Sequence, residues 1–152
     1  MTELDKHLFP EQGYDMWGHC AAALDGCIYF MPSNARHIMK LDPINNDAMS
    51  SVGDDLGCRE FKYSGTVVGM DGCVYGIPRW SKRIIKYDPF NGTTLFVGKK
   101  VSKVFKCKGR GALGRDGCIY ALAENSEEVL KIDTANHSHC FVGNSIDSYH
   151  EG

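Results

Sequence analysis

Three aspartates at regular spacing are the residues of this chain whose pattern most suggests chemistry. Asp25, Asp71 and Asp116 stand 46 and 45 residues apart, and each begins the motif Asp-Gly-Cys-Ile/Val-Tyr. Three carboxylates could transfer protons or bind a divalent cation if the fold brought them together. Each is followed by glycine, however, and Asp-Gly is typical of a tight hairpin turn that the aspartate caps. We therefore interpret the three carboxylates as turn caps of separate repeats and predict no catalytic residue.

Histidine and cysteine could instead supply a metal site, but their spacing does not favour one. The seven cysteines form no Cys-x-x-Cys pair, and no cysteine and histidine cluster has zinc-finger spacing. His137 and His139 would face one side of a strand and could hold a metal, but we interpret them as part of a solvated strand face. The motifs of phosphate-binding loops, nucleophile elbows and metalloprotease helices do not occur. The sequence thus predicts neither a bound metal nor a cofactor.

The elements that carry these residues follow from an internal repeat with a period of about 45 residues. A second aspartate lies 17 residues after the first in every copy, within Lys40-Leu41-Asp42-Pro43, Lys86-Tyr87-Asp88-Pro89 and Lys131-Ile132-Asp133-Thr134. In the middle copy, β-branched and aromatic residues predict four strands, at 66–70, 73–77, 83–87 and 93–97. Apolar residues occupy both faces of these strands, which favours sheets packed face to face. Four-stranded antiparallel sheets at this period are typical of a β-propeller.

The repeat also carries a family resemblance. Asp-Gly-Cys-Ile-Tyr, the Pro or Ala loop after it and Ile-Met-Lys-Leu-Asp-Pro resemble blades of the Kelch-like and streptogramin-lyase-like (SMP-30-like) propeller superfamily, over roughly residues 17 to 143. The resemblance implies an all-β propeller, and the superfamily includes lyases, lactonases, lectins and interaction modules. The usual Kelch double glycine, the histidine and glutamate pattern of the lyase and the SMP-30-like metal carboxylates are not found. No catalytic residue is therefore carried over.

We expect a single repeat domain over residues 1–152, with three four-stranded antiparallel blades. Their approximate limits are 17–53, 63–98 and 108–143, with terminal segments at 1–16 and 144–152. Propellers usually have four to eight blades, so three blades are a half-propeller or part of a larger ring. Two apolar faces would then stay open, and we expect the chain to associate. Either a homodimer closes a six-bladed ring, or the remainder of a longer polypeptide covers these faces.

Function is expected at the end of the blades where the loops differ between repeats. The connection into the first strand and the loop between the second and third strands share that end, and variable loops on a rigid scaffold often bind ligands. We expect a non-catalytic scaffold that binds a partner protein there through aromatic, charged and polar side chains. Trp80 is the foremost candidate, because tryptophan is enriched in binding hot spots. The full set is Trp17, His19, Asn34, Arg36, Tyr63, Arg79, Trp80, Lys82, Lys108, Arg110, Glu124 and Asn125.

Two alternatives remain open at this point. The first is a metal-dependent lyase or lactonase with its site at the ring centre, and the second is a lectin-type propeller with one sugar pocket per repeat. Repeated sugar pockets should use similar loop residues in every copy. The loops here differ, since they read Ser33-Asn34-Ala35, Arg79-Trp80-Ser81 and Glu124-Asn125-Ser126. The loops therefore favour the scaffold over the lectin.

The composition narrows the class of partner. With 43% hydrophobic and 24% charged residues and a net charge of −2, the chain is globular and does not favour nucleic-acid binding. We interpret the basic run from Lys99 to Arg110 as a solvated connection. No apolar run reaches the roughly 18 residues of a membrane span, and the acidic start does not fit a secretory signal. An odd number of cysteines without such a signal predicts reduced thiols and a cytoplasmic location.

Overall fold

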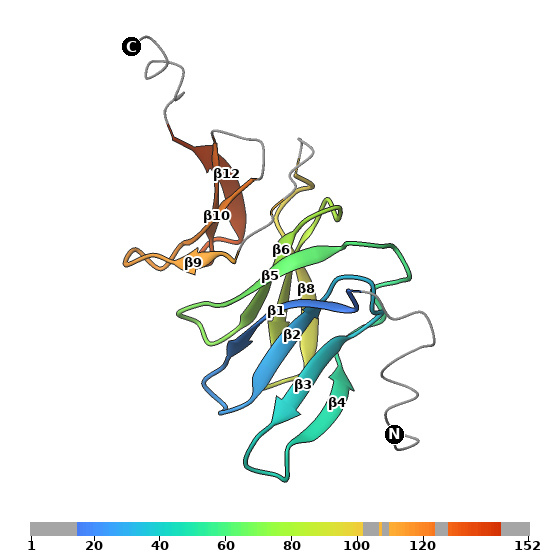
Figure 1. Cartoon of the computed structure of the whole chain (residues 1–152). Helices are drawn as coiled ribbons and strands as arrows, with labels where there is room; N and C mark the ends of the chain where they lie inside the picture. The colour runs from blue at the N-terminus through green and yellow to red at the C-terminus, as the bar shows by residue number, and fades with distance from the viewer. Residues whose placement is uncertain (1–14, 102–106, 108–109, 124–127, 144–152) are drawn as a thin grey trace, which may run out of the picture.

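The computed structural model describes residues 15–101, 107, 110–123 and 128–143, and it contains three four-stranded antiparallel sheets (Figure 1). No helix occurs within these ranges, so none there is long and apolar enough to cross a membrane. The expected all-β fold of propeller-type blades is confirmed. Blade 1 has β1 (Trp17–Ala22), β2 (Ile28–Pro32), β3 (Ile38–Asp42) and β4 (Ala48–Val52); blade 2 has β5 (Tyr63–Val68), β6 (Val74–Pro78), β7 (Ile84–Asp88) and β8 (Thr93–Val97); blade 3 has β9 (Ala112–Leu113), β10 (Ile119–Leu122), β11 (Val129–Asp133) and β12 (Ser138–Val142).

Each blade is a meander in which the strands pair in chain order. The first strands of successive blades are neighbours, since β1 contacts β5 and β5 contacts β9 (Figure 1). Gly18 in β1 makes the first of these contacts close, because a Cβ there would lie 2.6 Å from the carbonyl oxygen of Ser64. The first strands therefore form the inner side of the three blades.

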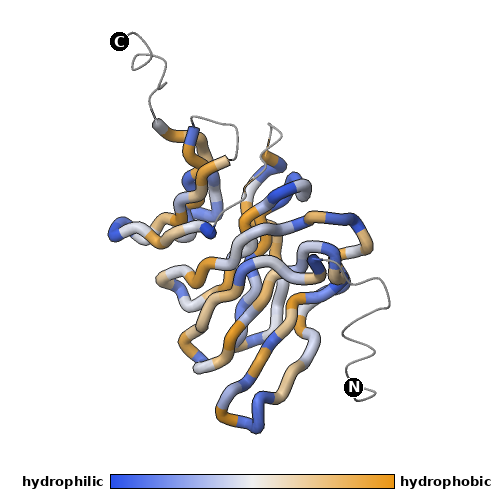
Figure 2. Tube along the Cα trace, in the orientation of Figure 1, coloured by the Kyte–Doolittle hydropathy of each residue, from blue (hydrophilic) through white to orange (hydrophobic). Residues whose placement is uncertain are grey.

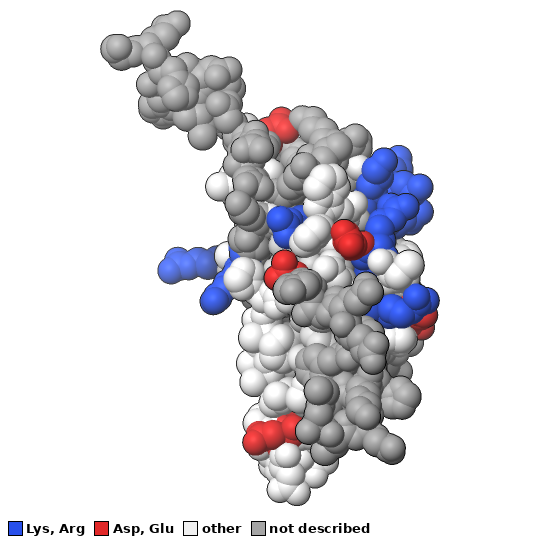
Figure 3. Space-filling view, turned by 45° about the vertical axis from the view of Figure 1, so that its right-hand side comes forward, with Lys and Arg blue, Asp and Glu red and all other residues white. Residues whose placement is uncertain are grey.

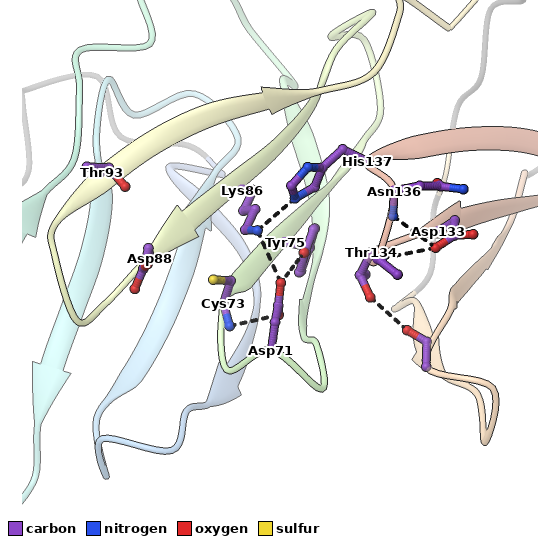
Figure 4. Close-up of polar contacts among 12 residues, drawn as sticks. Asp71, Cys73, Tyr75, Lys86, Asp88, Thr93, Asp133, Thr134, Asn136 and His137 are labelled. Carbon is purple, nitrogen blue, oxygen red and sulfur yellow. Dashed lines mark hydrogen bonds and ion pairs between the residues drawn. The ribbon is translucent and has the colours of Figure 1, made fainter.

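The repeated motif builds the hairpin turn between the first two strands of each blade. In blade 2, Oδ1 of Asp71 accepts a hydrogen bond from the backbone N–H of Cys73 at 3.0 Å, and the hydroxyl of Tyr75 donates to Oδ2 at 2.6 Å (Figure 4). Gly72 takes the positive φ of 78° that the turn requires. Asp25 and Asp116 make the same two contacts in their own blades. The aspartates thus cap separate turns, as the sequence predicts.

Strand register explains the lysine that follows each turn. Tyr75 and Lys86 are opposite each other on β6 and β7, so their side chains share one face of blade 2. Nζ of Lys86 lies 3.2 Å from Oδ2 of Asp71 and 5.8 Å from the centre of the Tyr75 ring. Burial raises the pKa of Asp71, but the hydrogen bonds from Tyr75 and Cys73 and the contact with Lys86 outweigh it and hold that pKa below its usual value. The lysine ends in an ion pair with its own turn.

The core lies between the blades rather than within one sheet. Tyr29 and Met31 of blade 1 pack against Val74 and Ile85 of blade 2, whereas Tyr75 faces blade 3. Successive residues of β6 therefore face different neighbours, and all five residues of this strand are buried. Figure 2 shows the apolar residues along the strands that meet between the blades. This packing explains the apolar residues on both faces of each strand.

Within the described residues, two apolar faces have no neighbouring blade. On the leading face of blade 1, Ile28 and Leu41 are half-buried. On the trailing face of blade 3, Leu122 is 58% exposed, although Ile77, which is its equivalent 45 residues earlier, is completely buried against blade 3. The same repeat position is thus covered inside the molecule and uncovered at its end.

Candidate functional site

A pocket of about 320 Å³ opens at the end of the blades that carries the variable loops. We call it the inner pocket, because strands β1 and β5 of the inner side supply most of its walls. Four side chains that the sequence singled out lie along it, two from β1, one from β5 and one from the β6–β7 loop: Trp17, His19, Tyr63 and Arg79. Asp15, Gly18, Ser33 and Ser64 complete the lining.

The backbone before the first strand of each blade fixes these residues. The carbonyl of Lys62 accepts hydrogen bonds from the backbone N–H of Arg79 at 2.9 Å and of Ser81 at 3.2 Å. The carbonyl of Phe61 accepts from the N–H of Trp80 at 2.8 Å, and Phe61 has a φ of 50°. Blade 1 repeats this arrangement with Asp15 and Met16. In blades 1 and 2 the variable loop is therefore hydrogen-bonded to the segment that leads into its own blade.

Several side chains of the inner pocket are held in place by the fold. The indole Nε1 of Trp17 donates to the carbonyl oxygen of His37 at 3.0 Å. The guanidinium of Arg79 stacks over the Phe61 ring at 4.7 Å. The hydroxyl oxygen of Ser64 is buried and has no hydrogen-bond partner within the described part of the chain. The pocket thus combines a fixed aromatic ring and a cation with a serine whose buried hydroxyl has no partner among the described residues.

The other predicted residues take different places. Trp80 is 46% exposed beside Arg79, but it does not line the pocket. Asn34 supports the loop, because its Oδ1 accepts from the N–H of Phe61 at 2.7 Å. Arg36 forms an ion pair with Asp55 at 2.7 Å. Lys82 and Arg110 are exposed, whereas Lys108, Glu124 and Asn125 lie outside the described residues.

The two histidines do not form the strand pair that the sequence suggested. His137 lies in the turn before β12 with a φ of 54°, and its Nε2 is 2.9 Å from Nζ of Lys86 in blade 2 (Figure 4). His139 lies on β12, and burial lowers the pKa of its ring. No group of three metal-binding side chains occurs within the described ranges. The expectation of a shared strand face failed because the turn extends one residue further than expected.

Sequence reasoning missed a second pocket, of about 470 Å³, which we call the lateral pocket. It lies between the segment that joins blades 1 and 2 and the β6–β7 loop, and three cations line it: Arg59, Lys62 and Arg83. Figure 3 shows lysine and arginine side chains gathered along one edge of the molecule. A comparison of repeats could have found Lys62, since it stands where the other two copies have Met16 and Cys107.

Solved structures share this fold at low sequence identity. Virginiamycin B lyase from Staphylococcus aureus matches with a TM-score of 0.67 and 14% identity, over 82% of this chain and 40% of that one. A putative 6-phosphogluconolactonase from Bacteroides fragilis matches with 0.60 and 14%, over 82% and 37%. An auxiliary nutrient binding protein from Bacteroides ovatus matches with 0.62 and 13%, over 85% and 32%. No protein-family model and no curated protein matches the sequence.

These similarities concern the fold. The chain spans less than half the length of each of these structures, and their names cover a lyase, a lactonase-like protein and nutrient-binding proteins. The streptogramin-lyase-like side of the expected resemblance is supported, whereas the Kelch-like side is not confirmed. One blade architecture therefore serves several activities, and function has to be argued from the pockets.

Proposed function

We propose that this protein is a propeller-type scaffold that binds a partner protein at its variable-loop end, with the inner pocket at the centre of the contact. One observation carries the proposal. Trp17, His19, Tyr63 and Arg79 come from two blades and three separate segments, yet they line one pocket. Aromatic and arginine side chains around a pocket are the usual anchors of protein interfaces.

The chemistry of the pocket favours an acidic segment of the partner. A volume of about 320 Å³ accommodates one or two side chains rather than a folded element. Arg79 can bind a carboxylate, and the buried hydroxyl of Ser64 offers a donor beside it. Trp80, 46% exposed, supplies an apolar surface next to the pocket. We propose a partner segment that presents a carboxylate followed by an apolar residue.

The proposal is tested with a panel of short peptides, half of them acidic with one apolar residue and half basic. Intrinsic fluorescence reports binding, since Trp17 lies in the pocket and Trp80 beside it. Acidic peptides should bind, and the Trp17→Ala/Trp80→Ala double variant, followed by peptide anisotropy, should lose at least tenfold in affinity. Arg115→Ala, at the turn end of blade 3, is the control and should bind normally. Undiminished binding by a folded double variant would refute the proposal.

We further propose that a second copy of the chain covers the two open faces and closes a six-bladed ring. The trailing face carries Tyr120, Leu122 and Val129 at the repeat positions of Tyr75, Ile77 and Ile84, which are fully buried between blades 2 and 3. The leading face of blade 1 carries the repeat positions that, in blade 3, pack against blade 2. Each face therefore fits the other as blade 2 fits blade 3. A longer polypeptide that supplies further blades is the competing outcome.

Two other proposals about the protein follow from the same observations. All seven cysteines are free, which supports a reducing compartment and a cytoplasmic location. A metal-dependent lyase or lactonase is the alternative activity, and metal analysis of the purified protein separates it from the scaffold. A stoichiometric divalent metal that raises the unfolding temperature would favour the enzyme. A sugar-binding propeller is separated by the same fluorescence titration with monosaccharides in place of peptides.

A further inference from the structure

The lateral pocket contains a lysine that the fold buries almost completely. Lys62 is 4% exposed, and its Nζ donates to the carbonyl oxygens of Gly57 at 3.0 Å and Arg59 at 2.8 Å. Among the described residues no carboxylate lies within ion-pair distance of it. Burial lowers the pKa of Lys62, because the charged form loses its hydration. The two carbonyls satisfy hydrogen bonds, but burial outweighs the attraction of Cys58 and Asp55, and no carboxylate of the described residues pairs directly with this buried positive charge.

The repeat does not require a lysine at this position. Lys62 follows Met16 by 46 residues and precedes Cys107 by 45, the two steps of the repeat. The backbone roles agree, since the carbonyl of Met16 accepts three hydrogen bonds, and that of Lys62 two, from the loop after the second strand. Methionine is half-buried there and Cys107 is completely buried. An apolar side chain therefore suits the position, and the lysine is specific to blade 2.

The other two cations of the pocket also have no acidic partner within the described ranges. The guanidinium of Arg83 lies 5.3 Å from the centre of the Phe96 ring, and Arg59 is exposed. Glu60, the carboxylate nearest in sequence, is exposed and forms no ion pair among the described residues. Asp55 is already bound by Arg36, which contributes both Nε and Nη2 to it. Three cations thus line one pocket, and none of them has a carboxylate within ion-pair distance among the described residues.

Neutral donors complete the lining. The hydroxyls of Ser81 and Tyr63 face each other at 3.4 Å, and Ser81 also contacts the backbone of Arg83 at 3.2 Å. Both hydroxyls can donate to a ligand oxygen without any rearrangement of the backbone. With a volume of about 470 Å³, the pocket is large enough for a small anion that carries several oxygens.

We propose that the lateral pocket binds a compact oxyanion, either a phosphate or a carboxylate group of a small molecule, with Lys62 as the buried anchor and Arg59 and Arg83 as the outer cations. This site shares Tyr63 with the inner pocket of the proposed function, but its three cations lie outside that pocket, and the site does not depend on that function. Arginine and lysine together are the usual protein partners of phosphate and carboxylate, and burial strengthens their attraction.

The test is a calorimetric titration of the full chain with sodium phosphate and, separately, sodium citrate, at constant ionic strength. Saturable binding of either anion is expected, and the stronger of the two identifies the ligand chemistry. Lys62→Met should weaken binding at least tenfold, and Arg83→Gln at least threefold. Arg115→Met removes one positive charge at the other end of the blades and should bind normally. No saturable binding by the unaltered chain, or equal binding by Lys62→Met, would overturn the proposal.

A thiol in the same pocket gives a second, local readout. Cys58 lines the lateral pocket and is exposed, while Cys20 and Cys140 are exposed elsewhere. Bound anion should slow alkylation of Cys58 without slowing the other two, as followed by peptide mass spectrometry. This protection should disappear in Lys62→Met, and its persistence there would contradict the proposal. Because Met16 occupies the equivalent position in blade 1, Lys62→Met should fold, and Arg83→Gln provides the same comparison without changing a buried residue.

Discussion

Shortening one side chain on the trailing face tests how the three blades are completed. Leu122 is 58% exposed, and the proposed ring buries it against the leading face of a second copy. A fully buried leucine is worth about 2.5 kcal/mol, so covering this exposed fraction contributes roughly 1.5 kcal/mol to each contact. A two-fold ring contains the contact twice, so Leu122→Ala should weaken association by about 3 kcal/mol, or roughly 150-fold in Kd. The isolated chain should lose almost no stability, because this side chain is exposed there.

Sedimentation equilibrium over a range of protein concentrations measures this change directly. The unaltered chain should form a dimer, and Leu122→Ala should shift towards monomer. Ile44→Ala is the matched control, because Ile44 is 89% exposed in the turn between β3 and β4 and lies on neither open face. A monomeric unaltered chain would refute the second copy and point to further blades of a longer polypeptide. Equal Kd values for the unaltered chain and Leu122→Ala would refute the proposed face.

Three further predictions concern the turn motif of blade 2. Tyr75→Phe removes a buried donor to Asp71 and should lower the free energy of unfolding in urea by about 1–2 kcal/mol. Tyr87→Phe is the control and should lower it by less than about 0.5 kcal/mol, because the hydroxyl of Tyr87 forms no hydrogen bond within the described residues. Because the pKa of Asp71 is lowered in the folded state, its carboxylate contributes its full stabilisation above about pH 4, and this stabilisation is lost as the pH falls towards the folded pKa. Asp71→Asn should therefore flatten the dependence of the urea midpoint on pH below about pH 4. An unchanged slope would contradict this account. Gly72→Ala should destabilise the fold by more than the roughly 1 kcal/mol expected for Gly57→Ala. Both glycines have positive φ, but of the two only Gly72 would bring a Cβ close to side-chain atoms, at 3.2 and 3.3 Å. Equal shifts of the unfolding temperature in the two variants would show that these close contacts relax.

The sequence was sufficient to predict the blade, because the information for each sheet is local. Asp71 and Gly72 specify the turn, and the turn sets the register of β5 and β6 that places Val67 opposite Tyr75. These contacts join residues that are close in the chain. Three copies of the pattern made the period, and therefore the architecture, visible without any relative.

The pockets were only partly predictable, because they form between segments that are distant in sequence. Trp17 and Arg79 share a pocket because β1 and β5 approach each other closely. Gly18 permits this approach, but a glycine in the sequence does not predict it. The sequence predicts that candidate residues gather at the variable end of the blades, and four of them line the inner pocket there. Which of them line the pocket, and that Trp80 lies outside it, required the positions of both blades.

The two kinds of repeat position have different physical demands, which explains where function can arise. Tyr29 and Tyr75 occupy one position that is fully buried between blades, and substitution there would leave a cavity or an unpaired carboxylate. At the loop end, Ser33 and Arg79 are equivalent, as are Met16 and Lys62, and at these positions the backbone makes the hydrogen bonds that position the loop. Side chains there can change without loss of the blade. Lys62 goes further, since it places a charge where the repeat accepts an apolar residue, and this cost is explained if the charge binds a ligand. The Lys62→Met variant distinguishes a binding role from a structural role of this lysine. If its unfolding temperature in anion-free buffer equals or exceeds that of the unaltered chain, the lysine is retained for binding. If the variant is clearly less stable, the lysine serves to hold the carbonyls of Gly57 and Arg59.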